Sequence, residues 1–239
     1  MKRYLWMLIF IFLPCLLPAQ KFEIAGGMGY GACSMSDLKT LNEDIMKRLP
    51  FESEVVDDFP AWFFYRLSFT TMIGKKISLG GLYTHSSSGS RVSSADYSGE
   101  YYFDTRLAAN SVGLQFGVKA FQHRNFDVRL KVVAGTILTH AGFHENLEVN
   151  GSRLSDEYTM NSLSFYFNPE IGVHYRFGIL GVAVFGGYRV DTKGHLNYNG
   201  QKTNLITDWS GFNVGAELVV MIPFAKEKHK DKAVTILAR

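Results

Sequence analysis

Apolar and polar side chains alternate strictly between Leu163 and Phe177. The odd positions are Leu163, Phe165, Phe167, Pro169, Ile171, Val173, Tyr175 and Phe177, and the even positions are Ser164, Tyr166, Asn168, Glu170, Gly172, His174 and Arg176. Successive side chains of a β-strand point to opposite faces, so this pattern predicts a strand with one wholly apolar face. Strands of soluble proteins usually have about five or six residues, so a strand this long favours lipid against the apolar face.

The same alternation recurs along the chain and predicts eight strands. The segments are 21–33, 61–73, 77–85, 105–121, 126–140, 163–177, 179–190 and 211–224. Short connections at 74–76, 122–125 and Gly178 alternate with long ones at 34–60, 86–104, 142–161 and 191–210. Tight turns at one end and long loops at the other are typical of outer-membrane barrels. We therefore predict an all-β fold, a closed eight-stranded antiparallel up-and-down transmembrane β-barrel.

A water-soluble lipocalin-like barrel is the structural alternative. Such a barrel would turn its apolar face inward around a ligand. Here the opposite face consists largely of glycine, serine and charged residues, which favours the membrane interpretation.

The N-terminus has the three parts of a secretory signal peptide. Lys2 and Arg3 precede an apolar run from Leu5 to Leu13, and the segment then ends on the small residue Ala19. A lipoprotein anchor at Cys15 is the alternative, although a proline stands where that signal has a small residue. The predicted organisation is a signal peptide at 1–19, the barrel at 20–224 and a basic periplasmic tail at 225–239.

Charge and cysteine content exclude several classes of function. Residues 20–239 carry 23 basic and 22 acidic side chains, which leaves no positive surplus for nucleic acid. Cys33 is the one cysteine in this range, so no intrachain disulfide is predicted. His140 and His144 have a spacing that binds zinc on a helix, but here they fall at the end of a predicted strand. We interpret them as polar residues of the external rim and predict no metal and no cofactor.

Several short motifs resemble one group of proteins. They are Leu17–Gln20 at the export junction, Gly89–Arg91 with Asp96–Gly99, Pro169–Gly172, and Trp209–Phe212 with Pro223–Phe224. With these motifs the chain resembles OmpA/OmpX-type eight-stranded outer-membrane barrels, and more closely the "outer membrane protein beta-barrel domain" proteins of Bacteroidota. The resemblance covers nearly the whole mature chain and implies a place in the cell outer membrane. One departure is that fifteen residues follow Phe224, the aromatic that ends the last strand.

Four charged residues lie at strand positions whose side chains point into the predicted barrel, near the middle of its height. They are Arg66, Lys131, Glu170 and Glu217. Charges inside a narrow barrel are costly unless they are paired, so we predict one network that plugs the interior. A narrow pore gated by these charges is the functional alternative.

An enzymatic alternative involves His85, Ser87 and Glu100. Outer-membrane lipid A deacylases are eight-stranded barrels with a His-x-Ser pair and a downstream Glu, so this resemblance implies a lipid A-modifying hydrolase. We favour a non-catalytic barrel whose external loops mediate surface interaction or envelope structure, with Arg91, Asp96, Tyr97 and Gly99 as external-loop residues. The predicted partners are outer-membrane lipid and lipopolysaccharide, the barrel-assembly machinery during insertion, and an unknown surface ligand.

Three local features are also predicted. Ser36 caps a short amphipathic helix in the first external loop. This helix ends at Pro50 and folds over the barrel rim. Pro169 lacks an N–H and interrupts the ladder of its strand or lies at a bulge. Aromatic side chains form two interfacial belts. The external belt is Tyr30, Trp62, Phe63, Tyr83, Phe165, Tyr188 and Phe212, and the periplasmic belt is Phe22, Phe126, Tyr175, Phe177 and Phe224.

Overall fold

The computed structural model describes residues 21–95, 97 and 99–223. The strands are β1 (Lys21–Gly31), β2 (Glu54–Asp58), β3 (Trp62–Ile73), β4 (Ile77–Ala95), β5 (Gly99–His123), β6 (Phe126–Val149), β7 (Ser152–Phe177), β8 (Leu180–Asp191), β9 (Gly194–Tyr198), β10 (Gln201–Thr207) and β11 (Gly211–Pro223); the helix is α2 (Ser36–Arg48). The predicted all-β class is confirmed. The predicted signal peptide, Phe224 and the predicted tail lie outside the described residues.

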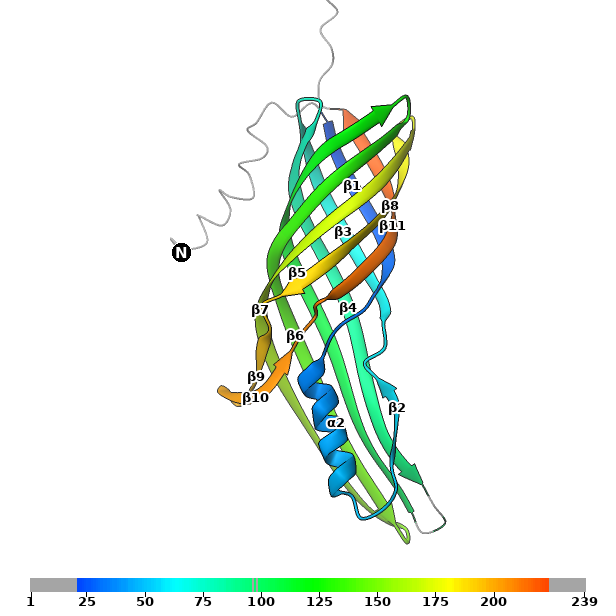
Figure 1. The fold of residues 1–239 in the computed structure, drawn as a ribbon, viewed down its shortest axis with the longest axis vertical. Helices are drawn as coiled ribbons and strands as arrows, with labels where there is room; N and C mark the ends of the chain where they lie inside the picture. Colours follow the sequence, from blue (N-terminus) through cyan, green and yellow to red (C-terminus); the bar gives the residue numbers. More distant parts are fainter. Residues whose placement is uncertain (1–20, 96, 98, 224–239) are drawn as a thin grey trace, which may run out of the picture.

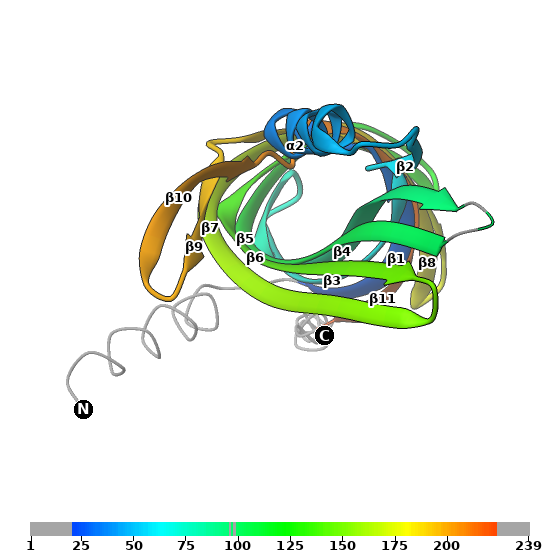
Figure 2. The same ribbon diagram turned by 90° about the horizontal axis from the view of Figure 1, so that it is seen from below.

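Eight strands form a closed antiparallel ring. Its order is β1-β3-β4-β5-β6-β7-β8-β11, and β11 pairs with β1 to close it. Each ring strand overlaps one of the eight predicted segments. Figure 1 shows the ring from the side, and Figure 2 shows it from below. The sequence did not indicate β2, β9 and β10, which are short and lie in connections predicted as loops: β2 pairs with β4, β9 with β7, and β10 with β9.

The predicted loops at 86–104 and 142–161 are wrong. β4 and β5 stay paired as far as Ala95 and Glu100, and β6 and β7 stay paired up to the turn at Asn150 and Gly151. Both turn residues have positive φ, 49° and 79°, which matches the preference of Asn-Gly for tight hairpins. The four strands therefore continue past the ring as one sheet. We call residues 86–109 and 140–161, together with α2, β2, β9 and β10, the extension.

The helix packs along the extension, as Figures 1 and 2 show. Leu38 and Asn42 are buried, and Leu41, Ile45 and Met46 pack against the same apolar cluster. The predicted cap is wrong: Ser36 is already helical, and Met35 holds the N-cap position in the left-handed region (φ 46°) without a side-chain cap. Met35 is completely buried, so apolar packing fixes the start of the helix where a hydroxyl was expected.

Pro169 interrupts the ladder on one side. Its pairing with Val132 on β6 is regular, but the β7–β8 ladder runs from Phe167 opposite Val190 directly to Glu170 opposite Gly187. Because the register is the same before and after this gap, Pro169 removes pairing without a bulge. The predicted interruption is confirmed.

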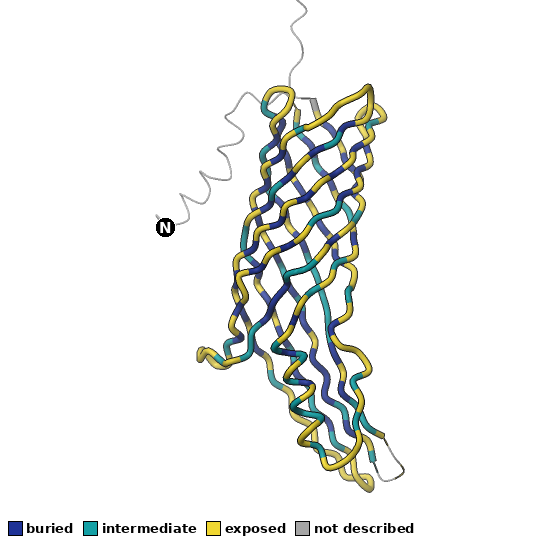
Figure 3. The backbone as a smooth tube through the Cα atoms, in the orientation of Figure 1, coloured by how far each residue is buried: buried dark blue, intermediate teal, exposed yellow. Residues whose placement is uncertain are grey.

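The ring and the extension bury different sets of side chains. Inside the ring the buried set includes Arg66, Arg129, Lys131, Glu170 and Glu217. The apolar cluster of the extension includes Phe103, Leu107, Phe143 and Leu196, and it continues into the adjoining part of the ring through Leu82, Val133 and Ile137. Figure 3 shows the alternation of buried and exposed residues along the strands of both parts.

Candidate functional site

The structure brings the four predicted lumen residues together in one network. Arg66 donates to Glu170 through Nη1 at 3.0 Å and Nη2 at 3.3 Å. Its Nε lies 2.7 Å from Oε1 of Glu217, and Nζ of Lys131 lies 3.8 Å from Oε2 of the same carboxylate. All four side chains are almost wholly buried. Two cations and two anions therefore neutralise each other at the middle of the ring.

A glycine leaves space for this network, and an aromatic ring packs against it. Gly27 pairs with Arg66 on one side and with Glu217 on the other. A Cβ at Gly27 would lie 2.2 Å from the carbonyl oxygen of Ala216 and 2.8 Å from Cγ of Glu217, so a larger residue would clash with the β11 backbone and with the Glu217 side chain. The guanidinium of Arg66 also lies 4.0 Å from the ring centroid of Phe185, a distance suited to a cation–π contact.

A second cluster of charges, not predicted from the sequence, lies nearer the short turns. Arg129 is central: its Nη1 donates to Glu23 at 2.5 Å and its Nε to Asp127 at 2.6 Å. Lys119 and Arg176 also reach Asp127, at 3.9 and 3.4 Å. Inward parity marked all of these positions, but the prediction considered only charges near mid-height.

The two clusters leave little free space between them. A cavity of about 10 Å³ remains, lined by residues that include Glu23, Arg129, Lys131 and Glu217. This is close to the minimum volume that one water molecule needs. The paired side chains therefore fill the lumen at this level and leave no room for a hydrated ion.

The outer surface of the ring is apolar and bordered by aromatic side chains. Tyr30 lies against Phe63 at 5.6 Å between ring centroids, and Tyr188 lies against Phe212 at 4.8 Å. Other exposed apolar side chains of this surface include Leu67, Phe69, Val112, Leu114, Phe116, Leu163, Phe167, Ile171, Val182, Val184 and Leu218. This outward set agrees with the predicted parity. Among the described residues, no helix has the length and apolar character needed to cross a membrane.

Two pairs of polar side chains mark where the apolar surface ends. Nδ1 of His85 lies 3.0 Å from Oδ1 of Asn110, and Nδ1 of His140 lies 2.8 Å from Oδ1 of Asn161. The members of each pair are directly opposite each other on adjacent strands. We call these four residues the His–Asn border.

The pairing at the border is also inconsistent with the predicted catalytic group of His85, Ser87 and Glu100. His85 faces Asn110, and Ser87 is paired with Ala108 on β5. Glu100 is eight residues further along β5, about 26 Å away at the usual rise per residue. The structure therefore does not assemble a Ser-His-Glu triad from these residues, and the predicted grouping is wrong.

Beyond the border, polar and aromatic side chains gather on the outer face of the extension. Arg91 donates twice to Asp104, from Nε at 2.5 Å and from Nη2 at 2.6 Å, and its guanidinium lies 5.3 Å from the ring of Tyr102. The hydrogen bonds from Arg91 to Asp104 raise the pKa of Arg91 above its ordinary value. His144 meets Tyr102 at 5.4 Å between ring centroids.

Two further arginines complete this surface. Arg153 donates to Oδ1 of Asn146 at 2.6 Å and reaches the hydroxyl of Tyr102 at 3.5 Å, whereas the side chain of Arg106 is 81% exposed. We name this surface the arginine–tyrosine face; its residues are Arg91, Tyr102, Arg106, His144 and Arg153. A groove of about 300 Å³ adjoins it, lined by residues that include Trp62, Ser87, Ser88 and Arg106.

The predicted external-loop residues do not form one site. Arg91 belongs to the arginine–tyrosine face, but Tyr97 is fully exposed at the far tip of the β4–β5 hairpin. Gly99 begins β5, where a Cβ would lie 2.0 Å from the carbonyl oxygen of Glu148, so its role there is close strand approach. Asp96 lies outside the described residues. Sequence reasoning missed Tyr102 and Arg153 because it treated 86–104 and 142–161 as loops, where alternation carries no information. Arg106 lies inside the predicted strand 105–121, but it was not assigned to a surface.

No protein family model matches the chain, and no curated protein is significantly similar to it. Three solved structures of low identity align over most of its length. Neisserial surface protein A is 13% identical (84% of this chain and 97% of that chain covered, TM-score 0.42). Ail, the attachment invasion locus protein of Yersinia pestis, is 12% identical (84% and 99%, TM-score 0.40), and the outer membrane protein OprG of Pseudomonas aeruginosa is 14% identical (87% and 98%, TM-score 0.41). We therefore base the function on this chain's own residues, and the resemblance to the Bacteroidota family stays a prediction.

Proposed function

We propose that this chain is a closed eight-stranded β-barrel of the bacterial outer membrane that carries a rigid, non-catalytic binding platform outside the cell. The observation that supports it most is that the outward side chains change from apolar to polar at the His–Asn border. Outward side chains of β4–β7 are apolar on the ring side of the border, and polar or charged side chains such as Asp104, Arg106 and His144 follow beyond it. Such a change within single strands fits a boundary between lipid and water.

The lipid placement follows from the size of the apolar surface. It surrounds the ring, whereas soluble monomers rarely expose contiguous apolar patches above a few hundred Å². The end with three short turns is then periplasmic, and the extension faces outward, as in barrels with long external loops. Outer-membrane lipid and lipopolysaccharide are the partners of the apolar surface, and the barrel-assembly machinery is the partner during insertion.

The arginine–tyrosine face supports a binding role for the extension. Tyrosine and arginine are the residue types most enriched at energetically important interface positions. The pairing of β4 to β7 and the apolar cluster beneath them hold these side chains in place. A catalytic role has no assembled triad to support it, and a pore role conflicts with a lumen filled by ion pairs.

Cysteine labelling of intact cells tests the placement. We expect Glu157→Cys in the extension to react with a membrane-impermeant maleimide on intact cells. Lys75→Cys in a short turn should react only after the envelope is opened. Both variants carry Cys33→Ser, although burial already raises the pKa of the Cys33 thiol and slows its reaction. Equal labelling of both positions on intact cells would reject the proposed orientation.

Photocrosslinking tests the binding face. A photoreactive amino acid at Tyr102 should give a crosslinked adduct on cells in their natural community, and Arg106→Glu should reduce the yield at least about tenfold. The same amino acid at Tyr198, exposed on β9 away from this face, is the control. Equal adduct yields at the two positions, or no effect of Arg106→Glu, would contradict a specific role for the face.

A further inference from the structure

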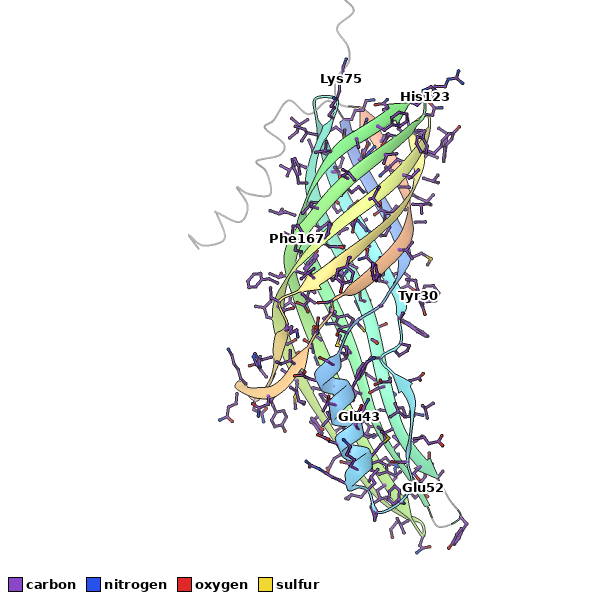
Figure 4. The ribbon with its side chains drawn as sticks, viewed as in Figure 1. Tyr30, Glu43, Glu52, Lys75, His123 and Phe167 are labelled. Atoms are coloured by element: carbon purple, nitrogen blue, oxygen red, sulfur yellow. The ribbon has the colours of Figure 1, made fainter. Side chains whose placement is uncertain are left out.

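The end of the ring that carries the short turns has a one-sided charge pattern. Its exposed charged side chains, within the described residues, are Lys21, Lys75, Lys76 and Arg124, with His123 beside them. The described carboxylates at this end belong to Glu23 and Asp127, and both are buried against Arg129. Figure 4 shows Lys75 and His123 at this end and Glu43 and Glu52 at the opposite end. Among the described residues, the exposed charges at this end are therefore all cationic.

Two short turns bring cations to this end at separate places on the rim, as the labels of Lys75 and His123 in Figure 4 show. The backbone N–H of Lys119, on β5, donates to the carbonyl oxygen of Lys76 at 2.8 Å, which joins the β3–β4 turn to the strand leading into the β5–β6 turn. Lys75 and Lys76 occupy the first turn, and His123 and Arg124 the second. Their exposed side chains thus distribute positive charge around the rim.

These cations are close in the sequence to apolar side chains of the outer surface. Lys76 precedes the exposed Ile77, and Arg124 lies between Phe121 and Phe126, whose rings contact each other at 6.4 Å between centroids. In a membrane, a cation placed just beyond lipid-facing rings lies at the depth of the headgroups. A soluble periplasmic ligand would not require this position.

The mouth of the ring at this end continues the pattern. A cavity of about 410 Å³ is lined by Lys21, Arg124 and Arg176, by the amides of Gln122 and Asn125, and by the apolar Gly178, Ile179 and Met221. None of these described lining residues carries a carboxylate. Cations and amide donors beside apolar side chains suit a phosphate group that is attached to a hydrocarbon chain.

We propose that this cationic rim, formed by Lys21, Lys75, Lys76 and Arg124, binds the phosphates of anionic phospholipids in the inner leaflet of the outer membrane. The rim anchors the short-turn end at the headgroup layer and fixes the depth of the barrel. The inference goes beyond the platform role and rests on the proposed membrane placement.

Spin-labelled lipids in nanodiscs test the proposal. The full-length mature chain is reconstituted in phosphatidylcholine with a trace of labelled phosphatidylglycerol or labelled phosphatidylcholine, and the immobilised fraction of each is compared. We expect a preference for phosphatidylglycerol of about fivefold, the effect of roughly one cation near the surface, and a decline towards equality in 1 M NaCl. The triple variant Lys75→Gln, Lys76→Gln, Arg124→Gln should lower the preference to below about twofold.

A matched triple variant removes the same charge from the extension: Lys39→Gln, Lys47→Gln, Lys202→Gln. It should keep the wild-type preference. Equal affinity of the wild-type protein for the two lipids, or equal losses in both triple variants, would overturn the proposal. Millimolar glycerol phosphate should leave the preference for phosphatidylglycerol unchanged. If glycerol phosphate abolished that preference, the rim would be a site for a free anion instead. Failure of membrane placement itself would appear differently, as no immobilised lipid of either kind.

Discussion

The ring and the extension share the strands β4 to β7 but differ in their interiors. In the ring, the charged side chains point inward together with some apolar ones such as Phe64 and Phe185, and the outward side chains are apolar. In the extension, the inward side chains form an apolar cluster under α2, and the outward ones form the arginine–tyrosine face. The backbone alternation continues across the border, so the difference lies in the side chains and in the medium that each part faces.

This contrast shows what replaces a hydrophobic core when lipid covers the outside. Lipid already accepts the apolar surface, so the inside of the ring has no excess of apolar groups to bury. Ion pairs such as Arg66 with Glu170 hold that interior together, and the cavity left between the two charge clusters has room for about one water. The extension faces water and is stabilised by apolar burial like a soluble domain.

The largest expected effect comes from breaking the lumen network. Glu217→Gln leaves Arg66 and Lys131 with one buried carboxylate in place of two, and should lower the free energy of unfolding by about 4 kcal/mol. Urea unfolding in detergent micelles measures the change, and Glu157→Gln, which neutralises an exposed acid of the extension, should cost less than about 0.5 kcal/mol. Discrete openings of Glu217→Gln in planar bilayers, with stability unchanged, would favour the gated pore instead.

Removal of a large apolar side chain should affect the extension alone. Phe143 is completely buried, so Phe143→Ala should destabilise the extension by about 3 kcal/mol. Limited proteolysis should then cut the extension faster, while the heat-resistant migration of the ring in gels stays the same. Leu154→Ala, at an exposed position on β7, is the control. A joint loss of both parts would show that they unfold as one unit.

A lysine scan on one face of β5 separates lipid from water. Leu114→Lys should cost about 2 kcal/mol because the ammonium group is placed in the hydrocarbon region. Ala108→Lys has the same parity but lies beyond the His–Asn border, and should cost less than about 0.5 kcal/mol. Equilibrium unfolding in lipid vesicles compares the two variants. Similar costs at both positions would remove the basis for a boundary between them.

The smallest effect concerns alkaline pH. Burial raises the pKa of Tyr101, and the carboxylate of Glu145, which accepts its hydroxyl at 3.0 Å, raises it further. The unfolded chain loses this proton near pH 10 and the folded chain at higher pH, so the extension should lose stability as pH rises above about 10. Tyr101→Phe should cost about 1 kcal/mol at pH 8 and flatten this dependence in a proteolysis assay. An identical pH dependence in both proteins would assign it to other groups.

The ring was predictable because its alternation is physically forced. Apolar residues at every second position, as from Leu163 to Phe177, leave one arrangement that satisfies lipid on one side and paired charges on the other. The extension was missed because its apolar residues, such as Leu107 and Phe143, take the opposite parity to Leu114 and Leu138 on the same strands. A search for outward apolar residues alone therefore ends the predicted strands 77–85 and 126–140 at the border. The dipeptide Asn150–Gly151 was the available sign of a tight hairpin.

The lumen network was partly predictable from parity and height along each strand. Arg66, Lys131, Glu170 and Glu217 meet because opposite charges at one level have no other partner in a narrow interior. The second cluster around Arg129 also depends on Glu23, which comes from β1, a strand that is not adjacent to β6 in the ring. The arginine–tyrosine face could not be predicted, since it depends on the cross-strand register of Arg91 with Asp104.

The central claim is that the outward face of the strands passes from lipid to water at the His–Asn border. Spin-label accessibility along β5 tests it most directly. Single nitroxides are placed at Phe116, Leu114, Asn110, Ala108 and Arg106 in the protein in lipid vesicles. Collision rates with oxygen, which dissolves in lipid, are compared with those of a water-soluble nickel complex. We expect oxygen to dominate at Phe116 and Leu114, the two rates to cross near Asn110, and the nickel complex to dominate at Arg106. Uniform access of the nickel complex to all five positions would contradict the account.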